Sequence, residues 1–150
     1  MSIIRSTDDP VKRMAMLMAA LYVHMARELV SQLGQEKGSQ AIRDAIKSFA
    51  EQRVASMLKE AEERGLDINA ETYTLVRDMP GDAWIKDPDH PEDIIYCPMY
   101  EMWQHMNAGE LAKLYCEIDW HLMEPFNTKL ARPLCLTCGD DRCRFLLARQ

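Results

Sequence analysis

Residues 115–145 read YCEIDWHLMEPFNTKLARPLCLTCGDDRCRF and contain four of the five cysteines of the 150-residue chain. The segment begins with a helical pattern and continues with strand-like alternation on both sides of the turn-forming residues GDDR, 139–142. The alternation predicts a C-terminal β-hairpin formed by residues 129–138 and 142–149. The cysteines could form a metal site, supply a thiol nucleophile or simply pack in a core.

The residues that precede this segment are mostly helical in pattern. Apolar residues recur at spacings of three and four in residues 10–33 and 39–64, which is typical of amphipathic helices. In the first of these helices the stripe includes Met14, Met18 and Met25. We expect these methionines to pack inward.

The second half of the chain mixes short elements. Residues 94–97 have the composition of a short buried strand, and residues 99–107 and 110–123 have that of helices. The pattern therefore predicts an α+β fold, in which N-terminal helices pack on a small antiparallel sheet that ends in the C-terminal β-hairpin. We expect one domain over residues 1–150, with a helical part at 8–79 and a motif-bearing part at 80–150.

Charge and hydropathy exclude several classes of partner. The 18 basic and 24 acidic residues give a net charge of −6 without a basic block, so no nucleic-acid partner is expected. The longest apolar run, residues 14–26, is too short to cross a membrane. The polar N-terminus lacks the layout of a secretory signal. We expect a cytoplasmic protein with free, catalytic or metal-bound cysteines.

The predicted hairpin fixes which thiols can meet. With GDDR as the loop, Cys138 lies opposite Cys143 on one face of the ribbon. Cys135 is three residues from Cys138, so its side chain points to the other face. A regular hairpin therefore brings Cys138 and Cys143 together and excludes Cys135, whereas a bulge would change this register.

Zinc is the alternative that these thiols leave open. The sequence CLTC, 135–138, resembles half of a zinc knuckle, but no second half follows it. A composite site of Cys116, Cys138 and Cys143, completed by Asp119 or His121, would supply four ligands. No other cofactor is indicated.

Two charged residues near the thiols suggest chemistry. Cys116 and Asp119 are three apart and lie on one helix face, where the carboxylate raises the pKa of the thiol. The pair therefore suits contacts with different atoms of a substrate, although a core thiol and a capping or ion-paired acid would look the same. Arg132 shares a strand face with Leu130 and Leu134 and needs an anion, either Asp119 or a substrate carboxylate.

The run YCPMYEMWQHMNAGELAKLYCEIDWHLMEPFNTKLARPLCLTCGDDRCRF, residues 96–145, resembles the L-2-amino-thiazoline-4-carboxylic acid hydrolase family. The resemblance rests on the order and spacing of short motifs across about fifty residues. The matching residues are Cys97, Pro98 and Glu101; Glu110 and Leu111; Cys116 and Asp119; Phe126 and Asn127; Arg132; and Gly139, Asp140, Cys143 and Phe145.

The resemblance implies an α+β domain related to small-molecule-binding domains of the 4-vinyl-reductase type. It also implies a cofactor-independent hydrolase that opens a 2-aminothiazoline ring to a carbamoyl-cysteine. The alternative is a non-catalytic small-molecule-binding or zinc-binding sensor module, and a homodimer is compatible with either. The residues implied for catalysis are Cys116, Asp119 and Cys143, and those implied for substrate binding are Cys97, Glu101, Asn127 and Arg132.

Overall fold

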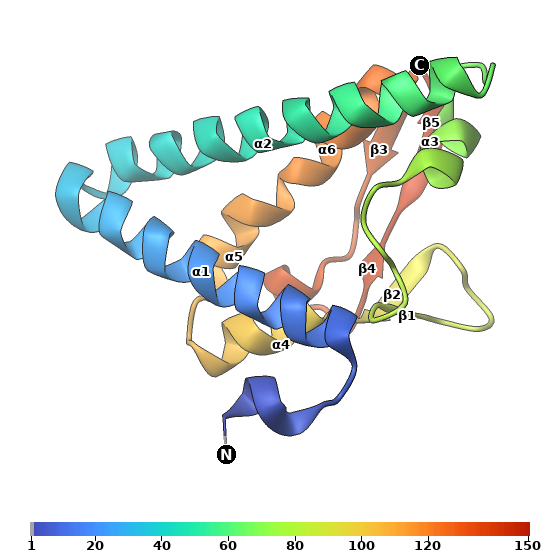
Figure 1. Ribbon diagram of the computed structural model, residues 1–150. Helices are drawn as coiled ribbons and strands as arrows, with labels where there is room; N and C mark the ends of the chain where they lie inside the picture. Colours follow the sequence, from blue (N-terminus) through green and yellow to red (C-terminus); the bar gives the residue numbers. More distant parts are fainter. Residues whose placement is uncertain (1) are drawn as a thin grey trace.

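A computed structural model describes residues 2–150 (Figure 1). Two long helices, α1 (Pro10–Leu33) and α2 (Gln35–Glu63), form a hairpin that opens like a V, and two short helices, α5 (Gly109–Cys116) and α6 (Ile118–Met123), lie between its arms. The other helical elements are η1 (Ile3–Ser6), α3 (Ala70–Val76), α4 (Pro98–His105), η2 (Glu124–Phe126) and η3 (Leu136–Cys138). The strands are β1 (Ile85–Lys86), β2 (Asp93–Tyr96), β3 (Thr128–Ala131), β4 (Cys143–Arg144) and β5 (Leu146–Arg149).

Glycines determine how closely the two long helices approach at their turn. Gly34, at φ 85°, ends α1 and begins α2, so the second helix starts one turn earlier than the predicted residue 39. Four residues later, a Cβ atom on Gly38 would lie 2.6 Å from the Cα atom of Val30. Only glycine permits this contact between the helix backbones.

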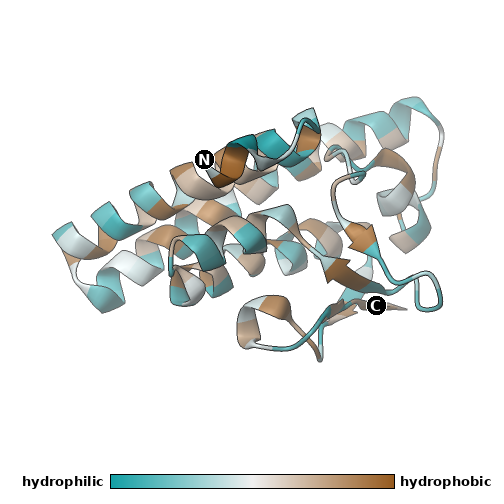
Figure 2. Cartoon of the chain, turned by 90° about the horizontal axis from the view of Figure 1, so that it is seen from below, coloured by the Kyte–Doolittle hydropathy of each residue, from teal (hydrophilic) through white to brown (hydrophobic). Residues whose placement is uncertain are grey.

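The buried face of α1 differs from the predicted stripe. Met14 and Met25 are 65% and 59% exposed, so the expectation that they pack inward is wrong, whereas Met18 packs against the core. The adjacent, buried face of α1 carries mostly small side chains, which allow α2 and α4 to pack close to it. Apolar and polar residues accordingly alternate along both long helices (Figure 2). The buried residues of α1 are Ala15, Met16, Ala19, Val23 and Ala26.

The strands form two small antiparallel sheets. One has the order β1-β2-β4, and the other pairs β3 with β5. Helix α6 packs on β3 and helix α3 packs on β5, below the far end of α2 (Figure 1). The predicted α+β fold with an antiparallel strand pair at the C-terminus is therefore confirmed.

The register of the C-terminal hairpin differs from the prediction. Ala131 lies opposite Leu146, and the carbonyl of Leu134 accepts a hydrogen bond of 3.0 Å from the Arg144 amide. The Leu136 amide also donates to the Cys143 sulfur at 3.2 Å, so residue 143 lies beside residues 134–136. The predicted pairing of residues 138 and 143 is therefore wrong.

A loop wider than GDDR causes the shift. Residues Leu136–Cys138 form a 3₁₀ turn that ends at Gly139, at φ 96°. The Asp140 carboxylate accepts a hydrogen bond of 2.8 Å from the Cys135 amide and closes this loop. Cys138 consequently lies in the turn and is exposed, rather than in a strand.

The predicted helix at residues 110–123 is two helices. The break falls at Glu117, whose amide donates a hydrogen bond to the Leu114 carbonyl, three residues earlier, as in a 3₁₀ helix.

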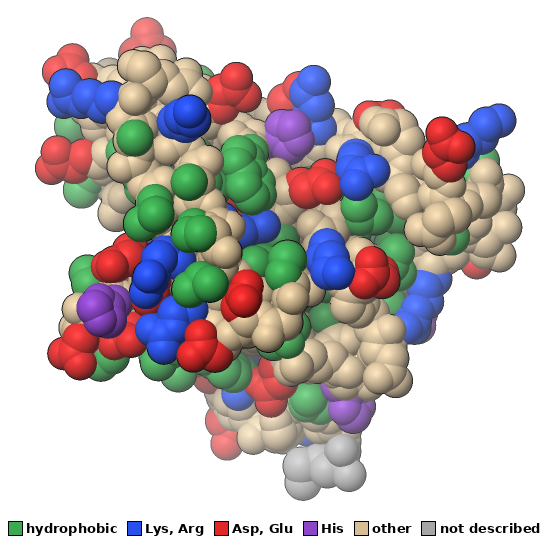
Figure 3. Space-filling view, turned by 180° about the vertical axis from the view of Figure 1, so that it is seen from behind, with side chains coloured by type: hydrophobic (Ala, Val, Ile, Leu, Met, Phe, Trp, Pro, Cys, Tyr) green, Lys and Arg blue, Asp and Glu red, His purple; other side chains and the backbone are tan. Residues whose placement is uncertain are grey.

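Acidic and basic side chains are interspersed on the face of the molecule seen in Figure 3. Among the described residues, no helix is long and apolar enough to cross a membrane.

Candidate functional site

An ion pair between Asp119 and Arg132 forms the centre of the candidate site. Arg132 Nη1 donates to Asp119 Oδ2 at 2.6 Å and to the Cys116 carbonyl at 3.1 Å. The guanidinium also stacks on the Trp120 ring, 4.6 Å from its centroid. Helix α6 thus supplies the acid and the indole, and the segment after β3 supplies the arginine. The internal acid is the partner of Arg132, as one of the two sequence-based alternatives proposed.

Two donors beside this ion pair lack partners. The Arg132 side chain is only 7% exposed, and its buried Nε makes no hydrogen bond within the described residues. The same holds for the hydroxyl of Tyr115, which is packed against Tyr22 and Trp103. An unpartnered buried donor costs free energy, so these two groups are candidates for contacts with a bound molecule.

The Asp119 carboxylate has an unusual acidity. Burial raises its pKa to about 6, and the attraction of Arg132 and Arg53 only partly opposes this effect. Its side chain is still 24% exposed, so solvent or a ligand can reach the carboxylate. A group of this kind exchanges protons readily near neutral pH.

The Cys116 and Cys97 thiols flank this carboxylate in protonated form. Burial raises the pKa of Cys116, and the nearby Asp119 raises it further. Burial also raises the pKa of Cys97, although its sulfur accepts hydrogen bonds from Trp84 Nε1 at 3.2 Å and from the Tyr100 amide at 3.5 Å. Neither thiol is a ready nucleophile at neutral pH.

Cys135 behaves in the opposite way. Its pKa is lowered, chiefly by a hydrogen bond from Cys143 and less by Thr137 and Arg132, although burial opposes this effect. That same hydrogen bond raises the pKa of Cys143, which therefore keeps its proton. Cys135 was not among the predicted catalytic residues, because the predicted register placed it on the opposite face from Cys143.

Two predicted substrate-binding residues are engaged elsewhere. Glu101 accepts a hydrogen bond from the Tyr96 hydroxyl and pairs with Lys12 at 3.4 Å. Asn127 takes a left-handed conformation at φ 53° between η2 and β3, and its Nδ2 donates to the Ile68 carbonyl at 3.2 Å. These hydrogen bonds and this ion pair are made to residues other than Asp119 and Arg132.

The predicted alternative zinc ligands are not gathered. Cys138 is exposed in the 3₁₀ turn, whereas Cys116 ends α5 and Cys143 is in β4. Over residues 2–150, no group of three or more His, Cys, Asp and Glu side chains is placed to hold a metal ion. The donor set therefore does not fit a zinc site.

Arg53 on α2 is a site residue that the sequence analysis missed. It is 9% exposed and binds Asp78 at 2.7 Å, and its charge lowers the pKa of Asp119 and of Tyr115. It lies on the same helix face as the buried Ala50 and Met57, three and four residues away. A charged residue in an apolar stripe was the signal that could have identified it.

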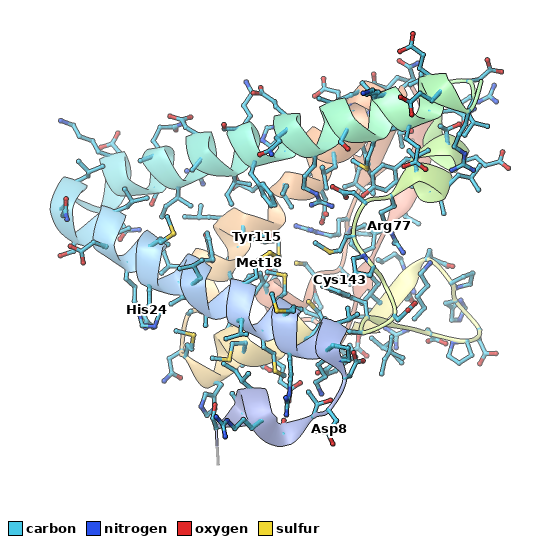
Figure 4. All side chains as sticks on the ribbon, in the orientation of Figure 1. Asp8, Met18, His24, Arg77, Tyr115 and Cys143 are labelled. Atoms are coloured by element: carbon cyan, nitrogen blue, oxygen red, sulfur yellow. The ribbon has the colours of Figure 1, made fainter. Side chains whose placement is uncertain are left out.

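The surface has one hollow near the Asp119–Arg132 ion pair and another at a distance from it. One of about 300 Å³ is lined by Trp120, Glu124, Thr128, Lys129, Leu130 and Gln150. Trp120 lines this hollow and stacks on Arg132, so it links the hollow to the ion pair. A second, of about 620 Å³, lies at the turn between α1 and α2. The side chains of Tyr115 and Cys143 lie in the interior of the molecule, whereas that of His24 points outward from α1 (Figure 4).

Comparison with known proteins identifies the family. The family model described as L-2-amino-thiazoline-4-carboxylic acid hydrolase matches residues 12–147. No curated protein and no solved structure shows a significant match. The match includes both long helices as well as the motifs in residues 96–145. The chain therefore belongs to the L-2-amino-thiazoline-4-carboxylic acid hydrolase family.

Proposed function

We propose that this chain is a hydrolase that opens a small cyclic amidine-like compound such as 2-aminothiazoline-4-carboxylate to a carbamoyl-cysteine. The match to the hydrolase family over residues 12–147 carries this proposal. The ion pair of Asp119 and Arg132 supports it, because it combines a proton acceptor with a buried cation.

Asp119 acts as the general base in this proposal. Ring opening requires water to add to the amidine-like carbon C2, and the water must lose a proton as it does so. Asp119 has its pKa raised to about 6, so it is ionised at pH 7 yet basic enough to accept that proton. Only its Oδ2 is bound by Arg132, which leaves Oδ1 to face the water.

Arg132 orients the substrate. Its Nη1 is committed to Asp119 and Cys116, but the buried Nε has no partner in the described residues. This donor can bind the carboxylate of the substrate, since a guanidinium recognises carboxylates through hydrogen bonds of fixed geometry. The Tyr115 hydroxyl is a second donor for a polar atom of the ring or its amino group.

Water, rather than a thiolate, is the attacking group. The raised pKa values of Cys116 and Cys97 keep these thiols protonated at neutral pH. Water adds to C2, Asp119 takes its proton, and the bond between C2 and the ring sulfur breaks. The sulfur leaves as a thiolate and is protonated, so one molecule of water is consumed and one free thiol appears. In this proposal Cys116 forms no covalent bond to the substrate and packs beside the leaving sulfur.

Turnover of 2-aminothiazoline-4-carboxylate by the purified chain tests this proposal. The carbamoyl product is detected by mass spectrometry together with the stoichiometric appearance of a new thiol. We expect Asp119→Asn to lower kcat/KM by about 10²–10⁴-fold, the usual contribution of a general base. Glu117→Gln is the matched control, because Glu117 lies two residues away and pairs with the exposed Arg43.

A folded Asp119→Asn protein with wild-type turnover would remove Asp119 from the mechanism. Saturable binding of the compound by the wild-type chain without any product would favour the non-catalytic binding module. We treat residues 1–150 as one domain that takes a small-molecule substrate. A cytoplasmic location and a homodimer stay predictions.

A further inference from the structure

The backbone of the C-terminal hairpin brings two thiols face to face. The Leu134 carbonyl accepts a hydrogen bond of 3.0 Å from the Arg144 amide, which holds the segments before and after the loop together. Cys135 follows Leu134 and Cys143 precedes Arg144, so both cysteines lie on the loop side of this hydrogen bond.

A side-chain contact confirms this arrangement independently. The sulfur of Cys143 accepts a hydrogen bond of 3.2 Å from the amide of Leu136, the residue that follows Cys135. The Cys135 sulfur lies 3.0 Å from Thr137 Oγ1. Both sulfurs therefore lie against the same short turn, and a disulfide requires proximity of this kind.

The two thiols also have complementary protonation states. The hydrogen bond from Cys143 lowers the pKa of Cys135 and raises that of Cys143, so Cys135 is the more readily ionised of the two thiols. A thiolate beside a second thiol is the usual composition of an oxidation-sensitive pair. The proposed ring opening uses neither of these thiols.

We propose that Cys135 and Cys143 form a redox-active dithiol that a peroxide converts to a disulfide. Cys135 is only 4% exposed, and hydrogen peroxide is an oxidant hardly larger than water. The Cys135 thiolate attacks one peroxide oxygen, breaks the O–O bond and becomes a sulfenic acid, and hydroxide leaves. Cys143 then attacks the sulfenic sulfur, and its proton departs with the oxygen as water.

Oxidation of Cys135 and Cys143 would also change the pKa of Asp119 in the ion pair. The Cys135 thiolate helps to raise the pKa of Asp119, and its charge is attracted to Arg132. A disulfide removes this negative charge. The pKa of Asp119 therefore falls in the oxidised protein, which makes the carboxylate a weaker base.

Mass spectrometry of the full, reduced chain tests the dithiol. After treatment with hydrogen peroxide and alkylation, we expect a protein that has lost two hydrogen atoms and carries three alkylated cysteines, five less the two that are joined. Trypsin cleaves after Arg142 and separates Cys143 from the peptide that contains Cys135 and Cys138. A disulfide-linked peptide pair that dithiothreitol releases is the expected result. Five alkylated cysteines, or a Cys135–Cys138 bond within one peptide, would overturn the proposal.

Two variants assign the partners. Cys138→Ser removes the exposed neighbouring thiol and is expected to leave disulfide formation intact. Cys143→Ser is expected to stop the reaction at the sulfenic acid of Cys135, which dimedone traps. If Cys138→Ser abolished the disulfide, Cys138 would be the true partner and the pairing proposed here would be wrong. The wild-type peptide map tests the proposal by itself, so the test does not depend on whether a variant folds.

Discussion

Two carboxylates with arginine partners, one in each sheet region, have opposite properties. Asp93 in β2 is fully buried, yet hydrogen bonds from Arg144, at 2.7 Å to each oxygen, and from Arg142, at 3.0 Å, hold its pKa well below the usual range. The side chain of Asp119 in α6 is partly exposed to solvent, yet it accepts only one hydrogen bond from its arginine partner, Arg132. Its pKa is raised to about 6.

The difference lies in how completely the charged form is bonded. Three hydrogen bonds from two guanidinium groups outweigh the cost of taking Asp93 out of water, so this carboxylate stays ionised and joins β2 to β4. A single partner does not offset the same cost for Asp119. A fully bonded carboxylate is suited to structure, whereas an incompletely bonded one is suited to proton transfer.

The largest effect on stability is expected from Asp93→Asn. The change removes the charge that Arg142 and Arg144 both bind and leaves their donors incompletely paired. We expect a larger fall in the free energy of unfolding than from either change below, measured by urea denaturation. Turnover per folded molecule should persist, and loss of turnover in a folded variant would show that the two acids do not have separate roles.

A smaller, pH-dependent effect is expected from Asp119. Its pKa is about 6 in the folded chain and 3.8 in the reference state, so between pH 4 and 6 the folded chain binds more protons at this position. Its contribution to stability therefore falls as pH rises, by up to about 3 kcal/mol in total. Asp93 acts in the opposite direction at lower pH, because its pKa is depressed on folding.

The comparison of wild type with Asp119→Asn isolates this effect. The variant should gain stability relative to wild type as the pH rises from 4 to 6, and the difference should level off above pH 7. Urea denaturation at one-unit pH intervals measures it. A stability difference that does not change with pH would mean that Asp119 titrates normally.

The smallest effect is expected at an exposed ion pair on α2. Glu60 and Arg64 are about half exposed and lie 3.1 Å apart. Glu60→Gln should change the free energy of unfolding by less than about 0.5 kcal/mol. A loss as large as that of Asp93→Asn would show that burial and the number of hydrogen bonds do not determine how much an acid contributes to stability.

The sequence predicted the parts of the site that depend on local spacing. The fold class follows from helical and strand periodicity, and the proximity of Cys116 to Asp119 follows from one helical turn, even though the helix breaks at Glu117. The need of Arg132 for an anion follows from its apolar neighbours in sequence. These features depend on a few residues at a time.

The remaining features depend on contacts between distant segments. The pairing of Cys135 with Cys143 was missed because Asp140 closes a wider loop than the turn residues indicate. The raised pKa of Asp119 depends on burial by several elements, including the Arg53 region of α2. Neither the contact between these two cysteines nor the raised pKa of Asp119 can be predicted from residue spacing along one helix or strand.

A direct titration of Asp119 is the measurement that tests the central claim. Carboxyl carbon chemical shifts in the labelled chain, followed by NMR against pH, report the pKa of this residue, and the Asp119→Asn variant assigns its signal. We predict a midpoint near pH 6. A midpoint at or below 3.8 would make Asp119 a structural acid like Asp93, and would contradict the proposed role as general base.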